Sequence, residues 1–274
     1  MPDSDAELAV RSAVAGADVV RSFFGGPLER IAKESGDFAT EADVAAERAI
    51  IAILRGARPE DRITGEELGD VGPPASARSW LVDPLCGTAN FSAGTPLVAV
   101  NVALRVGEGI VAAAVADPFS GEVFWTDGEV ARVRAAGQDV PLAPDAASRL
   151  VDVNVDPPFP NRDRFLAARL LHDRAFGDAF GARVLSTSLA LAWVAAGRRV
   201  AYVTDGDVRD SVHFAAGIAL CRAAGCVVTG LAGQPLHHGA QGLVAASDGA
   251  THRTLIRMIT GQADPHGWPV DVDQ

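Results

Sequence analysis

The sequence has few cysteines, few aromatic residues and a shortage of positive charge. Its 274 residues include three cysteines and one tyrosine, and aromatic residues make up 6% of the chain. A small, odd number of cysteines argues against a disulfide framework and favours a reducing compartment. Lysine and arginine number 24 against 35 acidic residues, so the formal net charge is −11. A surface this negative disfavours nucleic acids and anionic membranes as partners.

Long apolar runs are also missing. No uninterrupted apolar run reaches about 18 residues, the length typical of a membrane-spanning helix. The stretch that follows Asp3 is acidic and lacks the charged start and apolar run of a signal peptide. We therefore expect a cytoplasmic protein. Hydrophobic residues make up 48% of the chain, which is enough for a large core.

Residue periodicity predicts two different halves. In the first half it predicts helices over 4–24 and 42–54, followed by antiparallel strands over 79–82, 97–105, 110–116 and 122–126. In the second half, strands over 151–155, near 183, and over 200–203, 226–229 and 242–246 alternate with helices over 161–173, 188–196, 212–224 and 251–259. A segment rich in Pro, Asp and Ala separates the halves, so we expect domains over 1–145 and 146–274. The predicted class is α/β, with an α+β first half.

Four polar segments lie at the ends of predicted elements: 37–43, 65–67, 80–91 and 210–217. The third is the most informative. A strand ends at Asp83-Pro84, and Gly87-Thr88 can open a turn whose backbone amides face an anion. A carboxylate beside such amides indicates a cation between them, and Mg²⁺ is commonly held by carboxylates and a substrate phosphate. The same residues also form plain β-turns, so this segment alone leaves both interpretations open.

Together the four segments resemble the inositol monophosphatase superfamily, whose pattern is D-x-x-T-x-x-D, G-E-E, W-x-x-D-P-I-D-G-T-x-N-F and W-D-x-A-A-G. The matching residues are Asp37, Thr40, Asp43, Gly65, Glu66, Glu67, Trp80, Asp83, Pro84, Gly87, Thr88, Asn90, Phe91, Ala215, Ala216 and Gly217. Their order and spacing hold over nearly the whole chain. The resemblance implies the layered αβαβα sandwich of the inositol monophosphatase and fructose-1,6-bisphosphatase type, and a homodimer.

The resemblance also implies a metal and phosphate site. Glu66, Asp83 and the backbone carbonyl of Leu85 would hold one Mg²⁺. The backbone amides of Gly87 and Thr88 would bind the phosphate.

The implied reaction is hydrolysis of a small phosphorylated metabolite, of the inositol or sugar phosphate type, by in-line attack of a metal-bound water. The Thr88 hydroxyl and the Asp43 carboxylate would orient and deprotonate that water. Asp207 and Arg209 are weaker candidates, for contacts with the substrate. The resemblance thus implies a divalent-metal-dependent phosphomonoesterase.

Val212 replaces the tryptophan of the last motif, and two further departures from the family pattern fall at its second metal. Cys86 and His213 replace aspartates that would hold this ion with Asp83. The second site is then abandoned, altered to take an ion such as Zn²⁺ or Mn²⁺, or completed by Asp210. Alternatively, Cys86 is a small buried hydrophobe and His213 a hydrogen-bonded side chain without a metal. The departure also leaves open a weak or inactive relative that binds a phosphorylated ligand or a protein partner.

Overall fold

The computed structural model describes residues 3–33, 38–156, 166–238 and 241–262, which form two compact units. Unit 1 comprises the residues up to Leu142 together with Thr187–Ala192 and Ser211–Ala223. Unit 2 comprises Ala143–Ser186, Trp193–Asp210 and the residues from Ala224 onward. Within the described residues, no helix combines the length and apolar character needed to cross a bilayer.

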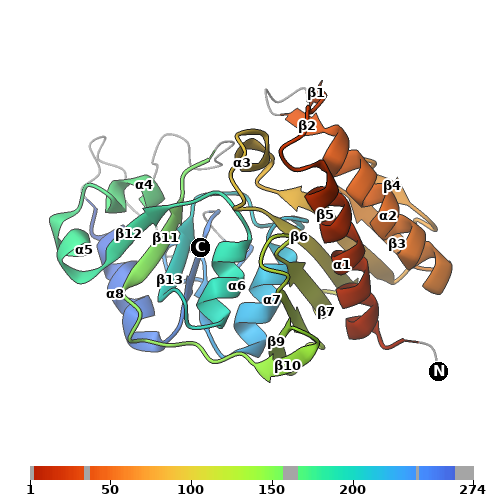
Figure 1. Cartoon of the computed structure of the whole chain (residues 1–274). Helices are drawn as coiled ribbons and strands as arrows, with labels where there is room; N and C mark the ends of the chain where they lie inside the picture. Colours follow the sequence, from red (N-terminus) through yellow and green to blue (C-terminus); the bar gives the residue numbers. More distant parts are fainter. Residues whose placement is uncertain (1–2, 34–37, 157–165, 239–240, 263–274) are drawn as a thin grey trace. The chain divides into compact units, whose positions relative to one another are not determined.

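Unit 1 is built on an eight-stranded sheet in the order β10-β9-β8-β7-β6-β5-β3-β4 (Figure 1). Its strands are β3 (Arg62–Gly65), β4 (Asp70–Val71), β5 (Arg78–Cys86), β6 (Ala99–Val106), β7 (Gly109–Ala116), β8 (Val123–Thr126), β9 (Ala131–Ala135) and β10 (Gln138–Pro141). Neighbouring strands are antiparallel except β3 and β5, which are parallel. The predicted antiparallel arrangement of the strands after residue 79 is therefore confirmed.

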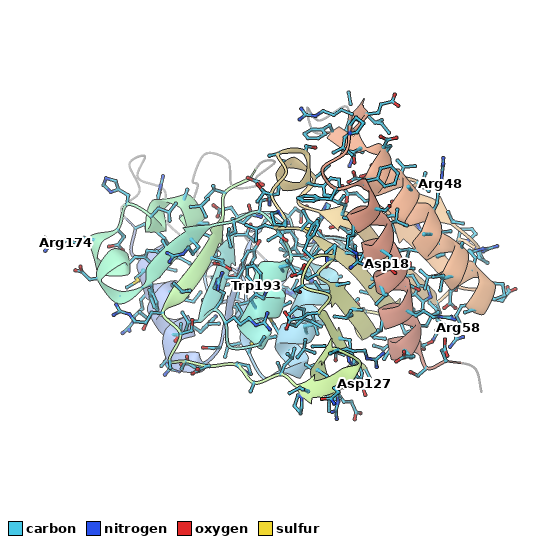
Figure 2. All side chains as sticks on the ribbon, viewed as in Figure 1. Asp18, Arg48, Arg58, Asp127, Arg174 and Trp193 are labelled. Atoms are coloured by element: carbon cyan, nitrogen blue, oxygen red, sulfur yellow. The ribbon has the colours of Figure 1, made fainter. Side chains whose placement is uncertain are left out.

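Helices pack against the strands of this sheet. The helices of the unit are α1 (Asp5–Phe23), α2 (Glu41–Ala57), α3 (Thr88–Ser92), α7 (Ala215–Ala223) and the first part of α6 (Leu189–Ala195). Helix α1 contacts β6 and β7, and α2 contacts β5, whereas α7 contacts β6, β7 and β8. The outer faces of α1 and α2 carry exposed charges such as Asp18 and Arg48 (Figure 2). A short ribbon of β1 (Arg30–Ala32) and β2 (Phe38–Thr40) precedes α2.

The start of α1 was predicted correctly. The Ser4 hydroxyl accepts a hydrogen bond from the Glu7 backbone amide at 3.2 Å, which satisfies one of the free amides of the first turn. The buried residues of α1, among them Leu8, Ala13 and Val20, join the core formed with α2 and one face of the sheet. Amphipathic spacing and a capping hydroxyl were thus sufficient to locate this helix.

The predicted end of the strand at Asp83-Pro84 is wrong. Strand β5 continues to Cys86, and its pairing with β6 shifts between Asp83 and Cys86. Val82 belongs to the core under α1 and α2, so alternation along the strand directs Asp83 to the opposite face. Asp83 pairs there with Asn101 of β6. Such irregularities re-aim side chains next to functional sites, and here the donor atoms of Asp83 and Cys86, three residues apart on β5, lie within 4.8 Å of each other.

Unit 2 contains a five-stranded mixed sheet in the order β12-β11-β13-β15-β14. Its strands are β11 (Leu150–Asn154), β12 (Gly181–Val184), β13 (Ala201–Thr204), β14 (Val227–Thr229) and β15 (Leu243–Ala246). The helices are α4 (Leu166–Leu170), α5 (Arg174–Ala179), the end of α6 and α8 (Gly249–Thr260). Of the helix predicted over 161–173, residues 161–165 lie outside the described residues. Parallel pairs β11–β12 and β11–β13 agree with the predicted α/β character.

Candidate active site

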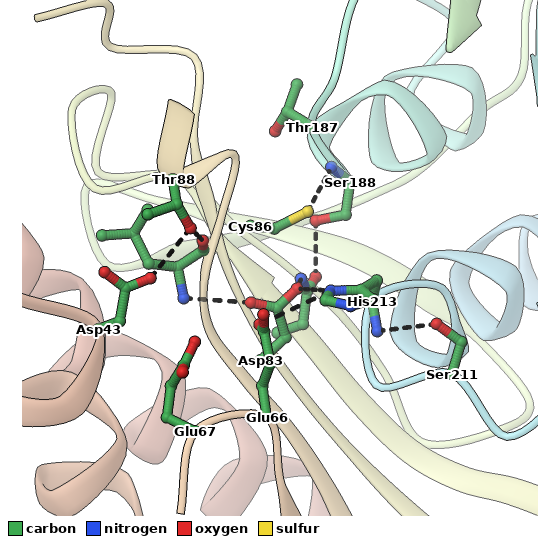
Figure 3. A network of polar contacts seen from close by, with 12 residues as sticks. Asp43, Glu66, Glu67, Asp83, Cys86, Thr88, Thr187, Ser188, Ser211 and His213 are labelled. Atoms are coloured by element: carbon green, nitrogen blue, oxygen red, sulfur yellow. Dashed lines mark hydrogen bonds and ion pairs between the residues drawn. The ribbon is translucent and has the colours of Figure 1, made fainter. Parts of the chain in front are cut away.

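Polar side chains from distant parts of the sequence gather within unit 1 (Figure 3). The predicted site residues that meet there are Asp43, Glu66, Asp83, Leu85, Cys86, Thr88 and His213. They come from α2, the segment after β3, the end of β5, the start of α3 and the turn before α7. Asp37, the first residue of the family pattern, lies outside the described residues.

The turn between β5 and α3 is fixed by local geometry. Gly87 has a φ of 100°, a left-handed conformation that glycine adopts without steric cost. Helix α3 begins at the next residue, Thr88. The Leu85 backbone amide donates to Asp83 Oδ1 at 3.1 Å. The Thr88 hydroxyl lies 3.1 Å from the Leu85 carbonyl oxygen. The motif glycine thus lets the chain turn sharply enough for these groups to meet.

Asp43 is fully buried at the start of α2 and has its two oxygens divided between two partners. Oδ2 accepts from the Thr40 backbone amide at 2.8 Å and from the Thr40 hydroxyl. Oδ1 accepts from the Thr88 hydroxyl at 3.0 Å. Burial raises the pKa of Asp43 to about 6, although these hydrogen bonds oppose the shift. At neutral pH the carboxylate is ionised and ready to accept a proton.

Asp43→Asn is expected to stabilise the protein above pH 6 when metals are removed by a chelator. Because the folded-state pKa of Asp43, about 6, exceeds its ordinary value of 3.8, the ionised carboxylate disfavours the folded state. The cost is at most about 3 kcal/mol, shrinks as the pH falls below 6, and disappears only below the ordinary pKa of 3.8, where the group is protonated in both states. Urea unfolding of both proteins across this pH range measures the difference.

Asp127→Asn is the matched control, because backbone amides of Val130 and Glu129 lower the pKa of Asp127. A group with a lowered pKa stabilises the fold above its ordinary pKa, so this exchange should bring no gain at pH 7. An Asp43→Asn protein that is less stable than the parent at pH 7 would show that its hydrogen bonds outweigh the burial of charge.

Glu66 and Asp83 place two carboxylates close together. Burial and the charge of Asp83 raise the pKa of Glu66 to about 8. The Lys33 ammonium donates to Glu66 Oε1 at 2.8 Å and to Glu67 Oε1 at 2.7 Å. Burial alone would lower the pKa of the Lys33 ammonium. Its hydrogen bond to Glu66 and the charge of Glu66 outweigh burial and raise this pKa above the ordinary value. The carboxylates of Glu66 and Glu67 therefore already bind one cationic group of the protein, the ammonium of Lys33.

These residues fit a hard divalent cation. Glu66 and Asp83 supply carboxylate oxygens, and the Leu85 carbonyl supplies a neutral oxygen, which is the donor set that Mg²⁺ prefers. The pKa of Glu66 is raised by burial and by the charge of Asp83, and a bound cation would offset both effects.

Glu47 holds the segment that carries Glu66. It is fully buried on α2, and its carboxylate accepts from the backbone amides of Glu67 at 2.8 Å and Leu68 at 2.9 Å. A Cβ on Gly65 would lie 1.8 Å from Glu47 Oε1. The glycine of the G-E-E motif therefore makes room for the carboxylate that fixes the rest of the motif.

Asp83 is fully buried, and His213 lies against it. His213 Nδ1 is 2.8 Å from Asp83 Oδ2 and 3.7 Å from Glu66 Oε2. Asn101 Nδ2 donates to the same Asp83 oxygen at 3.2 Å. Burial would raise the pKa of Asp83, but the charge of His213 and their hydrogen bond lower it below the ordinary value. Burial alone would lower the pKa of His213, but the charge of Asp83 and its hydrogen bond raise the pKa of His213 well above the ordinary value.

Cys86 lies between Asp83 and the segment before α6. The Ser188 backbone amide donates to Cys86 Sγ at 3.2 Å. Burial, followed by the charge of Asp83, raises the pKa of the thiol, so it is neutral without a metal. Asp83, Cys86 and His213 each offer one donor atom, and these atoms lie within 4.8 Å of one another. Cys86 is therefore part of the polar cluster rather than of the apolar core.

Four further residues of the site did not emerge from the sequence. They are Lys33, Glu47, Asn101 and Ser188. Glu47 had a usable signal, because it follows Asp43 by one helical turn on the buried face of α2. Lys33, Asn101 and Ser188 had no such signal, since their approach depends on strand register and tertiary packing.

Other predicted residues lie in unit 2. Asp207 accepts from the Arg209 backbone amide at 3.0 Å, and the Arg209 side chain donates to the His237 carbonyl. Asp210 is exposed and has a φ of 52°. The roles expected for Asp207 and Arg209 in substrate binding, and for Asp210 at the second metal, stay predictions.

Known proteins are similar to this chain in sequence and in architecture. The inositol monophosphatase family model matches residues 1–262. An inositol-1-monophosphatase of Caulobacter vibrioides is 36% identical over 204 residues, or 72% of this chain and 77% of that protein. The inositol-1-monophosphatase ImpA of Mycolicibacterium smegmatis is 31% identical over 252 residues, which cover 87% of this chain and 86% of that protein. The crystal structure of extragenic suppressor protein suhB from Bartonella henselae has a TM-score of 0.82 at 27% identity, covering 92% of this chain and 97% of that one. The predicted resemblance and the layered α/β fold are confirmed.

Proposed function

Because the chain belongs to the inositol monophosphatase family, we propose that unit 1 carries the active site of a divalent-metal-dependent phosphomonoesterase. The observation that carries the proposal is the hydrogen bond from the Thr88 hydroxyl to Asp43 Oδ1, beside the Leu85 carbonyl. It couples a hydroxyl at the edge of the predicted phosphate site to a buried base. The substrate is a small phosphorylated metabolite, and inositol and sugar phosphates come first because similar proteins are named inositol-1-monophosphatases.

The chain's residues divide the reaction between binding and proton transfer. The Gly87 and Thr88 amides bind phosphate oxygens at the start of α3. Thr88 Oγ1 takes a proton from a water while its own proton passes to Asp43 Oδ1, 3.0 Å away. The water attacks phosphorus in line with the leaving oxygen.

Asp43 suits the role of final proton acceptor. Thr40 occupies Oδ2 and leaves Oδ1 directed to Thr88, so the relay has a fixed direction. A pKa of about 6 keeps the group ionised at neutral pH and still basic enough to be useful. Mg²⁺ bound by Glu66, Asp83 and the Leu85 carbonyl would supply Lewis-acid stabilisation of the negative charge on the phosphoryl group.

A panel of phosphate monoesters tests the proposal, with released inorganic phosphate measured in Mg²⁺, Mn²⁺ and Zn²⁺. The intact protein should turn over at least one inositol or sugar phosphate faster than an Asp83→Asn, Thr88→Ala double variant. That variant loses a metal ligand and the relay, and circular dichroism checks its fold. Equal rates for the two proteins across the panel would refute the proposed activity.

A second function, ligand binding without hydrolysis, is favoured by the pairing of His213 with Asp83 at 2.8 Å. This pair places a positive side chain where the family pattern has another carboxylate, so charge at the site is partly balanced from within. In this case a phosphate ester would raise the melting temperature while no phosphate is released. Release above the double variant would exclude it.

A further inference from the structure

We propose that Asp83, Cys86 and His213 form a binding site for a soft transition-metal ion, with zinc the preferred occupant. The ion would take the place of the second magnesium expected from the family pattern. The proposal rests on the proposed function for the role of this ion in catalysis, but its binding is measured without turnover.

The three donor atoms already converge. A carboxylate oxygen of Asp83, Cys86 Sγ and a ring nitrogen of His213 lie within 4.8 Å of one another, and His213 Nδ1 is 2.8 Å from Asp83 Oδ2. Zinc bonds of about 2.0–2.3 Å in a tetrahedron place ligand atoms about 3.3–3.8 Å apart. His213 therefore has to move outward by about 0.5 Å or slightly more to admit the ion. It lies in a turn before α7, and 43% of its side chain is exposed, so the ring has solvent on one side to move into. The bonds of the ion to both groups would replace the direct hydrogen bond between His213 and Asp83.

Two of the three donors are held by outer contacts of the kind that orient metal ligands. Asp83 accepts from the Leu85 amide at 3.1 Å and from Asn101 Nδ2 at 3.2 Å. Cys86 Sγ accepts from the Ser188 amide at 3.2 Å. The Ser188 hydroxyl donates to Asn101 Oδ1 at 2.9 Å, which joins the two supports into one network. A backbone N–H directed at sulfur favours a thiolate, the form that binds metal.

The chemistry of the donors selects the ion. A thiolate and an imidazole are ligands for zinc and related transition metals, whereas magnesium takes oxygen ligands almost exclusively. Three protein ligands leave a fourth tetrahedral position, as catalytic zinc sites do. A substrate phosphate oxygen or a water can fill it. A carboxylate and a thiolate also balance the double charge of the ion. The joint presence of Cys86 and His213 is therefore better explained as one altered site than as two unrelated losses.

Cobalt(II) substitution tests the site directly. The chelator-treated protein is titrated with Co²⁺, and a sulfur-to-cobalt charge-transfer band in the near ultraviolet is expected. Cys86→Ser should abolish this band and weaken Zn²⁺ binding at least about tenfold, because a ligand is lost. Cys221→Ser is the matched control, since Cys221 is fully buried on α7 and donates to the Leu191 carbonyl. Its band should be unchanged.

Alkylation of the unaltered protein provides a second measurement that needs no variant. Cys86 is partly exposed, and mass spectrometry can follow its modification by iodoacetamide. Zn²⁺ should slow this modification, and Mg²⁺ should not. A charge-transfer band that is absent, or that persists in Cys86→Ser, would overturn the proposal, as would equal alkylation rates with and without Zn²⁺. A band without phosphate release in the ester panel would refute the proposed function and leave the metal site standing.

Discussion

Exchange of Thr88 for alanine is expected to lower kcat by about 10²–10⁴-fold, the usual contribution of a positioned acid–base group. The exchange removes the hydroxyl that lies 3.0 Å from Asp43 Oδ1 and so interrupts the proton path from water to carboxylate. The Thr88 backbone amide is retained, so binding of the phosphate should change little. Steady-state kinetics on the best substrate of the ester panel measure kcat and KM.

Thr88→Ser separates the hydroxyl from the rest of the side chain. It should restore most of the activity, because serine presents the same donor and acceptor at the same position. A rise in KM with kcat unchanged in Thr88→Ala would indicate a binding role instead of proton transfer. Full activity in Thr88→Ala would remove the relay from the mechanism.

Exchange of Arg199 for methionine is expected to destabilise unit 2 by about 3–5 kcal/mol, the cost of breaking a buried ion pair by removing one partner. Asp152 is fully buried on β11, and Arg199 Nε lies 2.8 and 2.9 Å from its two oxygens. The guanidinium also lies over the Trp193 ring, 4.7 Å from its centroid. Burial raises the pKa of Asp152 to about 6 even with Arg199 opposing the shift. Without Arg199 the buried carboxylate has lost its counter-charge.

The stability lost in Arg199→Met should depend on pH, because the pKa of Asp152 is raised in the folded state. Removing Arg199 raises the folded-state pKa of Asp152 further, so the ionised carboxylate costs more above pH 6 and nothing extra where it is protonated. Urea unfolding should therefore show a larger deficit at pH 8 than at pH 5. Arg198→Met, an exchange at the exposed neighbouring residue, should change stability by no more than about 0.5 kcal/mol. Equal deficits for the two variants would contradict the account.

Local sequence patterns predicted the helices and strands of this protein better than the contacts between them. Helix α1 followed from apolar spacing and the Ser4 cap, and α2 from its spacing after Thr40, because both signals lie within a few residues. Strand β5 was ended too early, since Pro84 is usually a strand breaker. The pairing shift between Asp83 and Cys86 accommodates it, and this shift depends on contacts with β6.

The residues of the active site also fall into two groups, those that local motifs predict and those that only tertiary contacts bring together. Asp43, Glu66, Asp83 and Thr88 were found because each belongs to a motif read along the chain. Asn101 was not found, because its approach to Asp83 requires the register of β5 on β6, which no local pattern determines. Ser188 lies 102 residues from its partner Cys86, and long-range packing alone brings them together.

The order in which unit 1 is assembled from the chain has a consequence during synthesis on the ribosome. Asp83 and Cys86 emerge early, but Ser188 and His213 belong to the returning segments Thr187–Ala192 and Ser211–Ala223. Until these segments leave the exit tunnel, the face of β6 and β7 that α7 contacts lacks its cover. The nascent chain therefore carries an unfinished site and an open sheet face through much of translation, an interval in which chaperones have a surface to bind.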